Sequence, residues 1–88
     1  MVKKKKSKEA LNLNRIKVVL AEKNISQIDL SEKVKRDRNT ISRICNNRNQ
    51  PSLVLLHEMA IALDVDVREL ITPTANVKES IAKSLRSN

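Results

Sequence analysis

Residues 26–46 read SQIDLSEKVKRDRNTISRICN, and this stretch decides the fold. Its first part predicts a helix over about residues 26–33. Ser26 and Asp29, three positions apart, form a capping box, in which each end of the pair satisfies a backbone N–H of the first helical turn. Lys33 and Val34 bring this helix to its end.

A second helix is predicted directly after the first, over about residues 38–46. Asp37 is a good N-cap, and Ile41 and Ile44 are spaced to face inward. Only three or four residues separate the two predicted helices. A turn this short forces them to cross steeply, which is the geometry of a helix-turn-helix.

Helical periodicity continues on both sides of this pair. A helix over about residues 12–23 precedes it, one beginning at Pro51-Ser52 follows it, and a short one runs from Asp66 to about Ile71. The apolar positions of the first and fourth helices are Leu13, Ile16, Val19, Leu20, Leu53, Leu56, Met59, Ala60 and Leu63. The prediction is an all-α, compact five-helix domain.

The ends of the chain differ in composition from this domain. Residues 1–10 are rich in lysine, with little to bury, and predict a basic disordered arm. Residues 11–72 form the domain. Residues 73–88 predict a tail that is either flexible or a short helix, with Val77, Ile81 and Leu85 recurring every four positions. Two roles stay open for the lysines: an arm that follows a groove of DNA, and an unspecific solubilising tail.

Composition limits the classes of function. The 88 residues carry a net charge of +8 and contain no Phe, Tyr or Trp. A basic excess points to a polyanion. Single-strand and RNA readers usually stack bases on aromatic side chains, and membrane-surface helices usually carry Trp or Phe, so duplex DNA is favoured. No apolar run approaches a membrane span, and no secretory signal is present, so we expect a cytoplasmic protein.

Catalysis and metal binding are not expected. The chain has one cysteine, Cys45, and one histidine, His57, which is too little for a zinc site. It has no Gly-rich phosphate loop and no paired carboxylate site, so we expect no enzyme, no cofactor and no small-molecule ligand. Cys45 is predicted to be a small core residue, with a redox-sensor role as the weaker alternative because burial opposes thiol reactivity.

Charge is distributed unevenly along the domain. Between Lys33 and Arg48 six cations stand against the single acid Asp37, whereas four acids outnumber Arg68 between His57 and Leu70. A field of this kind orients a protein on a phosphate backbone.

The ordered residues resemble the Cro/C1 (Xre-type) family of helix-turn-helix regulators, which implies a lambda-repressor-like fold. The matching runs are Ser26-Gln27-x-x-Leu30-Ser31-x-Lys33-Val34, Arg38-Asn39-Thr40-Ile41-Ser42-Arg43-Ile44-x-Asn46-Asn47, Gln50-Pro51-Ser52-Leu53-x-x-Leu56 and Leu63-Asp64-Val65-Asp66-Val67-Arg68-Glu69-Leu70. They follow one another in order over about residues 13–71, so a chance match is improbable.

The resemblance assigns roles to individual residues. In the family, the outer face of the second helix of the motif touches bases, and here this face holds Arg38, Asn39, Ser42 and Arg43. Arginine can pair with guanine and asparagine with adenine. The expected phosphate contacts are Gln27, Lys35, Arg36, Thr40, Asn46 and Arg48, which set register rather than sequence choice. The expected dimer surface is Val65, Val67, Leu70 and Ile71, extended by the stripe from Val77 to Leu85.

The sequence departs from the family pattern at several positions. Lys35 stands where the family often has a left-handed Gly, and Asn47 replaces another frequent Gly. Arg36 stands where an apolar residue often plugs the turn, so we expect it to lean outward. Leu20 and Cys45 occupy positions where some members bury an Arg–Glu pair, and no orphan charge results.

The expectation is a sequence-specific regulator of transcription, a repressor or autoregulator, that binds double-stranded DNA as a homodimer. Two alternatives stay open. One is a regulator that acts with a partner, such as an antitoxin or a restriction–modification controller. The other is a protein-interaction module that keeps the fold without using DNA.

Overall fold

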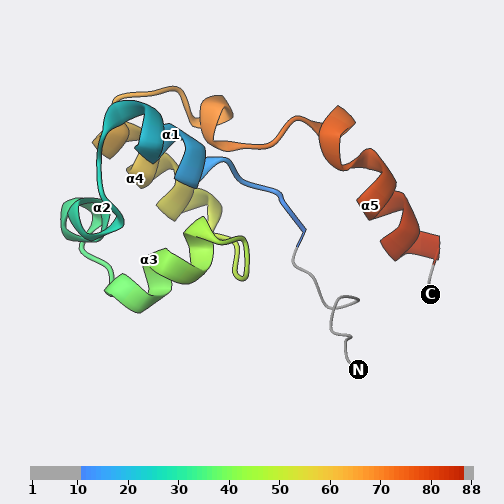
Figure 1. The fold of residues 1–88 in the computed structure, drawn as a ribbon, viewed down its shortest axis with the longest axis horizontal. Coiled ribbons are helices and arrows are strands. Elements are labelled where there is room, and N and C mark those ends of the chain that lie inside the picture. Colours follow the sequence, from blue (N-terminus) through green and yellow to red (C-terminus); the bar gives the residue numbers. More distant parts are fainter. Residues whose placement is uncertain (1–10, 87–88) are drawn as a thin grey trace.

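The computed structural model describes residues 11–86, and these form helices joined by short turns (Figure 1). The helices are α1 (Ile16–Lys23), α2 (Gln27–Val34), α3 (Arg38–Cys45), α4 (Leu53–Leu63), the 3-10 helix η2 (Val67–Leu70) and α5 (Thr74–Arg86). The five helices predicted for the domain are α1 to α4 and η2, so the all-α, five-helix fold class is confirmed, and α5 follows them. The lysine-rich residues 1–10 lie outside the described part of the chain, so the expected arm stays a prediction.

Side-chain caps fix where three of the α-helices begin. Ser26, Asp37 and Ser52 each accept a hydrogen bond from a backbone N–H of the first turn, at 3.0, 3.1 and 3.0 Å. Each cap satisfies one donor that has no partner inside the helix. The boundaries of α2, α3 and α4 therefore follow closely from sequence.

Helix α1 begins four residues later than the apolar pattern predicted. The preceding residues, Leu13 to Arg15, pair instead with the end of η2 and the residues that follow it. Arg15 donates its N–H to the carbonyl of Leu70, and Thr72 donates to Leu13, both at 2.9 Å. Asn14 and Ile71 form an isolated antiparallel bridge. This pairing holds the two ends of the domain together.

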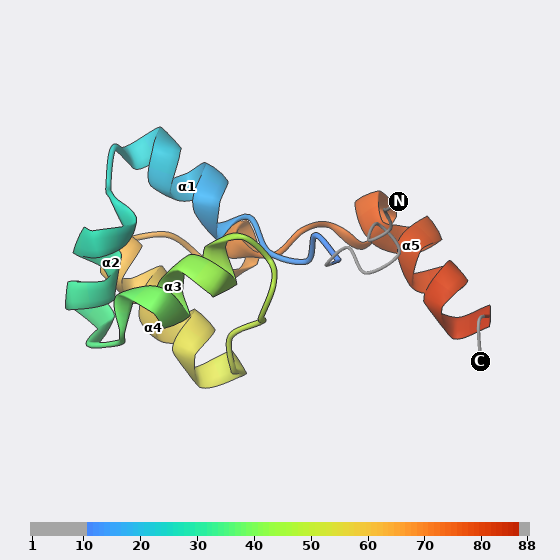
Figure 2. The same ribbon diagram turned by 60° about the horizontal axis from the view of Figure 1, so that its bottom comes forward.

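The core lies between α1, α2, α3 and α4, with η2 closing one side (Figures 1 and 2). Ile16, Leu30, Ile41, Met59 and Leu70 are fully buried there. Leu53, expected in the apolar stripe of α4, is instead 68% exposed, because α4 turns Leu55 and Leu56 inward. In both views α5 projects away from this body.

Within residues 11–86, four residues adopt the left-handed backbone conformation: Asn24, Lys35, Asn47 and Asp64, with φ between 57° and 59°. Glycine accepts this conformation freely, but the chain contains none. Lys35 ends α2 there, and the next residue, Arg36, donates its N–H to the carbonyl of Ser31 at 2.9 Å. The expected left-handed turn at Lys35 is therefore confirmed.

Replacing Lys35 with glycine is expected to stabilise the fold. The left-handed conformation costs a non-Gly residue about 1–2 kcal/mol, and the greater freedom of unfolded glycine offsets about 0.5–1 kcal/mol of this gain. Thermal denaturation should show a melting temperature higher by roughly 2–6 °C. Lys33→Gly is the matched control, because Lys33 is helical and the same change there should cost about 1 kcal/mol. Equal effects of the two changes would contradict this account.

Candidate nucleic-acid interface

Helix α3 has one buried face and one exposed face. Ile41, Ile44 and Cys45 are at most 3% exposed and anchor the helix in the core. The opposite face presents Arg38, Asn39 and Arg43 to solvent, with Ser42 half-buried beside them. The structure thus brings the four residues expected to contact bases onto one helix face. In Figure 2 this helix lies at the front of the body.

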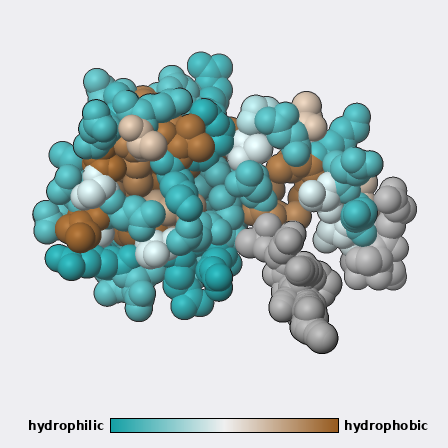
Figure 3. Space-filling model, viewed as in Figure 1, coloured by the Kyte–Doolittle hydropathy of each residue, from teal (hydrophilic) through white to brown (hydrophobic). Residues whose placement is uncertain are grey.

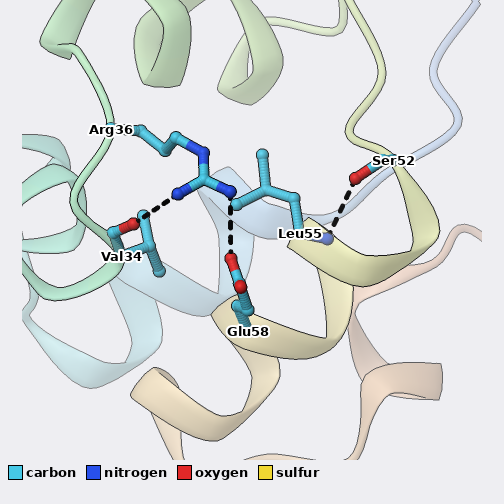
Figure 4. Close-up of polar contacts among 5 residues, drawn as sticks. All are labelled: Val34, Arg36, Ser52, Leu55 and Glu58. Carbon is cyan, nitrogen blue, oxygen red and sulfur yellow. Dashed lines mark hydrogen bonds and ion pairs between the residues drawn. The ribbon is translucent and has the colours of Figure 1, made fainter.

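The turn between α2 and α3 differs from the expectation at Arg36. This side chain is 41% exposed, but it also reaches across to α4 instead of extending freely into solvent (Figure 4). Its Nη1 donates to the carbonyl of Val34 at 2.9 Å, and its Nη2 donates to Oε1 of Glu58 at 3.2 Å. A half-exposed ion pair of this kind contributes at most about 1 kcal/mol. Its effect is to connect the turn to α4, and a phosphate contact by Arg36 would have to compete with Glu58.

The other expected phosphate contacts are spread around α3. Gln27 is the first residue of α2 and is half-buried, as is Thr40 in the first turn of α3. Lys35 is exposed in the turn between α2 and α3, and Arg48 is exposed in the loop after α3. Asn46 is already engaged, since its Nδ2 donates to the carbonyl of Ser42 and its Oδ1 accepts from Nζ of Lys17.

Sequence reasoning missed a cluster of side-chain amides at the C-terminal end of α3. Asn12, Asn14, Asn47 and Gln50 bond to one another and to nearby backbone groups. We call these four residues the amide network. The repeated Asn in the stretches NLN (12–14) and NNRNQ (46–50) was the available signal. Spacing along the chain did not show that the two stretches meet.

Within one chain, the residues expected at a dimer surface range from fully buried to exposed. Leu70 is fully buried in its own core, and Val65 and Val67 are half-buried against that core. Ile71 is 42% exposed, and on α5 Leu85 is 72% exposed. In this region the large exposed apolar side chains of the described residues are therefore Ile71 and Leu85.

Cys45 is 2% exposed, and burial raises the pKa of its thiol to about 11, opposed by the nearby charge of Lys17. The thiolate is the reactive form, so a raised pKa together with burial makes the native thiol inert. We expect a disulfide reagent at pH 8 to label Cys45 at least about tenfold more slowly in the native protein than in denaturant. Equal labelling rates would show that the core opens readily around α3.

The surface over α3 is polar, as expected if the outer face of this helix stays in contact with solvent. In Figure 3 the lower edge of the body, over α3, is mainly hydrophilic, and hydrophobic atoms show elsewhere on the molecule.

Asp66 belongs to the acidic stretch of the domain, between His57 and Leu70. Its carboxylate caps η2 and accepts a hydrogen bond from Nε of Arg68 at 2.8 Å, which lowers the pKa of the Asp66 carboxyl. Within residues 11–86 there is no group of acidic, His or Cys side chains arranged to hold a metal ion.

The fold and the exposed face of α3 together define a helix-turn-helix protein. The family model for the Cro/C1-type HTH DNA-binding domain matches residues 15–76. The chain therefore belongs to this family, and the resemblance seen in the sequence is confirmed. The match ends at the beginning of α5, so most of that helix lies outside the family pattern.

Solved structures agree with this assignment. A protein from Bacteroides fragilis, to which DNA binding has been ascribed, is 53% identical, with 68% of this chain and 97% of that chain covered and a TM-score of 0.67. The restriction-modification controller C.AhdI from Aeromonas hydrophila is 29% identical over 62% of this chain and 83% of its own, with a TM-score of 0.59. The hypothetical transcription factor NHTF from Neisseria is 26% identical over 74% of both chains, also with a TM-score of 0.59. None of the curated proteins compared matches this chain.

Each of the helices within residues 11–86 falls short of the length and apolar character that crossing a bilayer requires.

Proposed function

We propose that this protein is a transcriptional regulator that recognises a specific double-stranded DNA sequence through α3, and that it represses or autoregulates its target. The observation that carries the proposal is the outer face of α3, where Arg38, Asn39 and Arg43 are exposed while Ile41 and Ile44 hold the helix rigidly. A helix of this size fits the major groove, where each base pair presents a distinct pattern of donors and acceptors.

A homodimer is part of the proposal. One recognition helix reads only a few base pairs, whereas two related by a twofold axis and about 34 Å apart read an inverted repeat. Ile71 and Leu85 of α5 support a self-association surface, because within the described residues they are the large exposed apolar side chains beyond α4. In the single chain Val77 is buried and Ile81 is half-buried. Val65 and Val67 would flank it, and Leu70 would support it from the core.

Selection of binding sites from random duplex DNA tests the proposal directly. We expect an enriched inverted repeat with half-sites one helical turn apart. Sedimentation of the protein on this DNA should show two chains per site. Recovery of no sequence preference at any salt concentration would overturn the DNA-reading role. Binding of independent monomers to single half-sites would overturn the dimer.

A second candidate is control of a restriction–modification operon. The similarity to the controller protein C.AhdI favours it. In that case the selected sequence should occur upstream of the protein's own coding region, next to genes for a nuclease and a methyltransferase. The absence of such neighbours would leave the general regulator.

A further inference from the structure

The segment Asn12–Arg15 is bonded on two sides at once. Toward α3, the backbone N–H groups of Leu13 and Asn14 both donate to Oδ1 of Asn47, each at 2.9 Å. Toward the C-terminal side, Arg15 bonds to Leu70 through backbone groups, and its Nη1 donates to the carbonyl of Glu69 at 2.7 Å. The segment therefore joins the end of α3 to the region between η2 and α5.

The amide network makes this connection specific. Asn47 donates through Nδ2 to Oδ1 of Asn12 at 3.0 Å and to the carbonyl of Asn14 at 3.1 Å. Asn14, only 5% exposed, donates through Nδ2 to the carbonyl of Ile44 in the last turn of α3 at 2.9 Å and to Oε1 of Gln50 at 2.9 Å. Of the four residues Asn14 is buried and Asn47 half-buried, whereas Asn12 and Gln50 are exposed. Displacing Asn14 from Ile44 would leave a buried polar group without a partner, so the inner part of the network favours one geometry.

The backbone alone does not require this side chain. Asn47 has φ of 59°, a conformation that glycine adopts without cost. Glycine would therefore preserve the turn after α3 and remove five side-chain hydrogen bonds. The asparagine supplies a connection to the segment before α1 that the turn itself does not need.

We propose that Asn47 is a positioning residue that fixes α3 relative to the C-terminal dimer surface, so that the protein discriminates between operators by the spacing of their half-sites. The inference rests on the proposed function. One inserted base pair moves a half-site by about 3.4 Å and rotates it by about 34°. Ile41 and Ile44 anchor the inner face of α3 in the core, and the amide network adds a constraint at the C-terminal end of the helix. Without that constraint the helix end should follow such a displacement more readily.

The test compares Asn47→Gly with Asn24→Gly. Both positions are left-handed, with φ of 59° and 58°, so the two changes have the same effect on the unfolded chain. Asn24 ends α1, is exposed, and has no side-chain hydrogen bond within the described residues. It is therefore a matched control without a network.

Binding of full-length protein is measured on the selected inverted repeat and on versions with one base pair inserted or removed between the half-sites. Wild-type protein and Asn24→Gly should lose affinity by about tenfold or more on the altered spacings, the order of a base mismatch. Asn47→Gly should lose about threefold or less. A single substituted base within a half-site should weaken all three proteins equally.

The possible results separate the inference from the proposed function. A wild-type protein that is indifferent to spacing would remove both, because it would read half-sites independently. A spacing penalty unchanged in Asn47→Gly would overturn the inference alone, as would loss of half-site preference in that variant.

If circular dichroism shows Asn47→Gly to be unfolded, Gln50→Ala tests the inference in its place. Gln50 is exposed and contributes only the bonds at the outer edge of the network. It should give an intermediate penalty, and a wild-type penalty would count against the inference.

Discussion

The double variant Arg38→Ala/Arg43→Ala is expected to lose sequence preference while it keeps its fold. A well-placed arginine contributes about 1–3 kcal/mol of discrimination for guanine, so the two together account for roughly a 30-fold to 10⁴-fold change for each half-site. Both side chains are exposed on α3, so their removal should leave the melting temperature within a few degrees of wild type. Binding to the selected operator and to a scrambled duplex of equal length measures the effect.

Two single variants serve as controls for this prediction. Arg48→Ala, in the loop after α3, should weaken operator and scrambled duplex alike and reduce the salt dependence of binding by about one phosphate contact. Arg68→Ala, on the acidic side of the domain, should change neither. If the double variant still prefers the operator, α3 is not the reading element. If it fails to bind any duplex but still melts cooperatively, the two arginines act on phosphates.

The largest loss of stability is expected from Ile41→Ala. Ile41 is fully buried on the inner face of α3, and truncating such a residue costs about 2–5 kcal/mol through lost burial and the cavity left behind. A domain of this size has a total stability on the order of 5 kcal/mol. The melting temperature should fall by at least about 10 °C. DNA binding should be lost as well, because α3 is anchored through this residue.

Ile61→Ala is the matched control for the core prediction. Ile61 is also helical, in α4, but is 80% exposed, so the same change there should alter stability by no more than about 0.5 kcal/mol. Circular dichroism on heating follows both variants, which suits a chain without tryptophan or tyrosine. A small effect at Ile41 would show that the core rearranges around α3 and that the position of the helix is not fixed by packing.

Local sequence signals accounted for most of the fold. Ser26, Asp37 and Ser52 are strong helix caps, and each begins the helix it was expected to begin. Their side chains bond within three residues, so the relevant physics lies in a short stretch of sequence. The inward positions Ile41 and Ile44 followed from the same local periodicity.

The structural features that the sequence did not predict depend on contacts between residues far apart along the chain. The late start of α1 results from pairing of Leu13 and Arg15 with Thr72 and Leu70, more than fifty residues away. Arg36 turned toward α4 because Glu58, 22 residues further on, provides an acceptor. The amide network likewise joins stretches about 33 residues apart. No pattern within either stretch specifies such a partner.

The pairing of Leu13 and Arg15 with Thr72 and Leu70 also bears on how the domain can be rearranged. Since the first and last described segments of the body lie side by side, a short peptide should be able to link them, with new ends opened elsewhere. The exposed turn around Asn24, between α1 and α2, offers one such opening on the side away from α3. A circular permutant built in this way would retain the amide network and the outer face of α3. Groups fused next to the paired segments, before Leu13 and after Thr72, would instead emerge together, close to the end of the recognition helix.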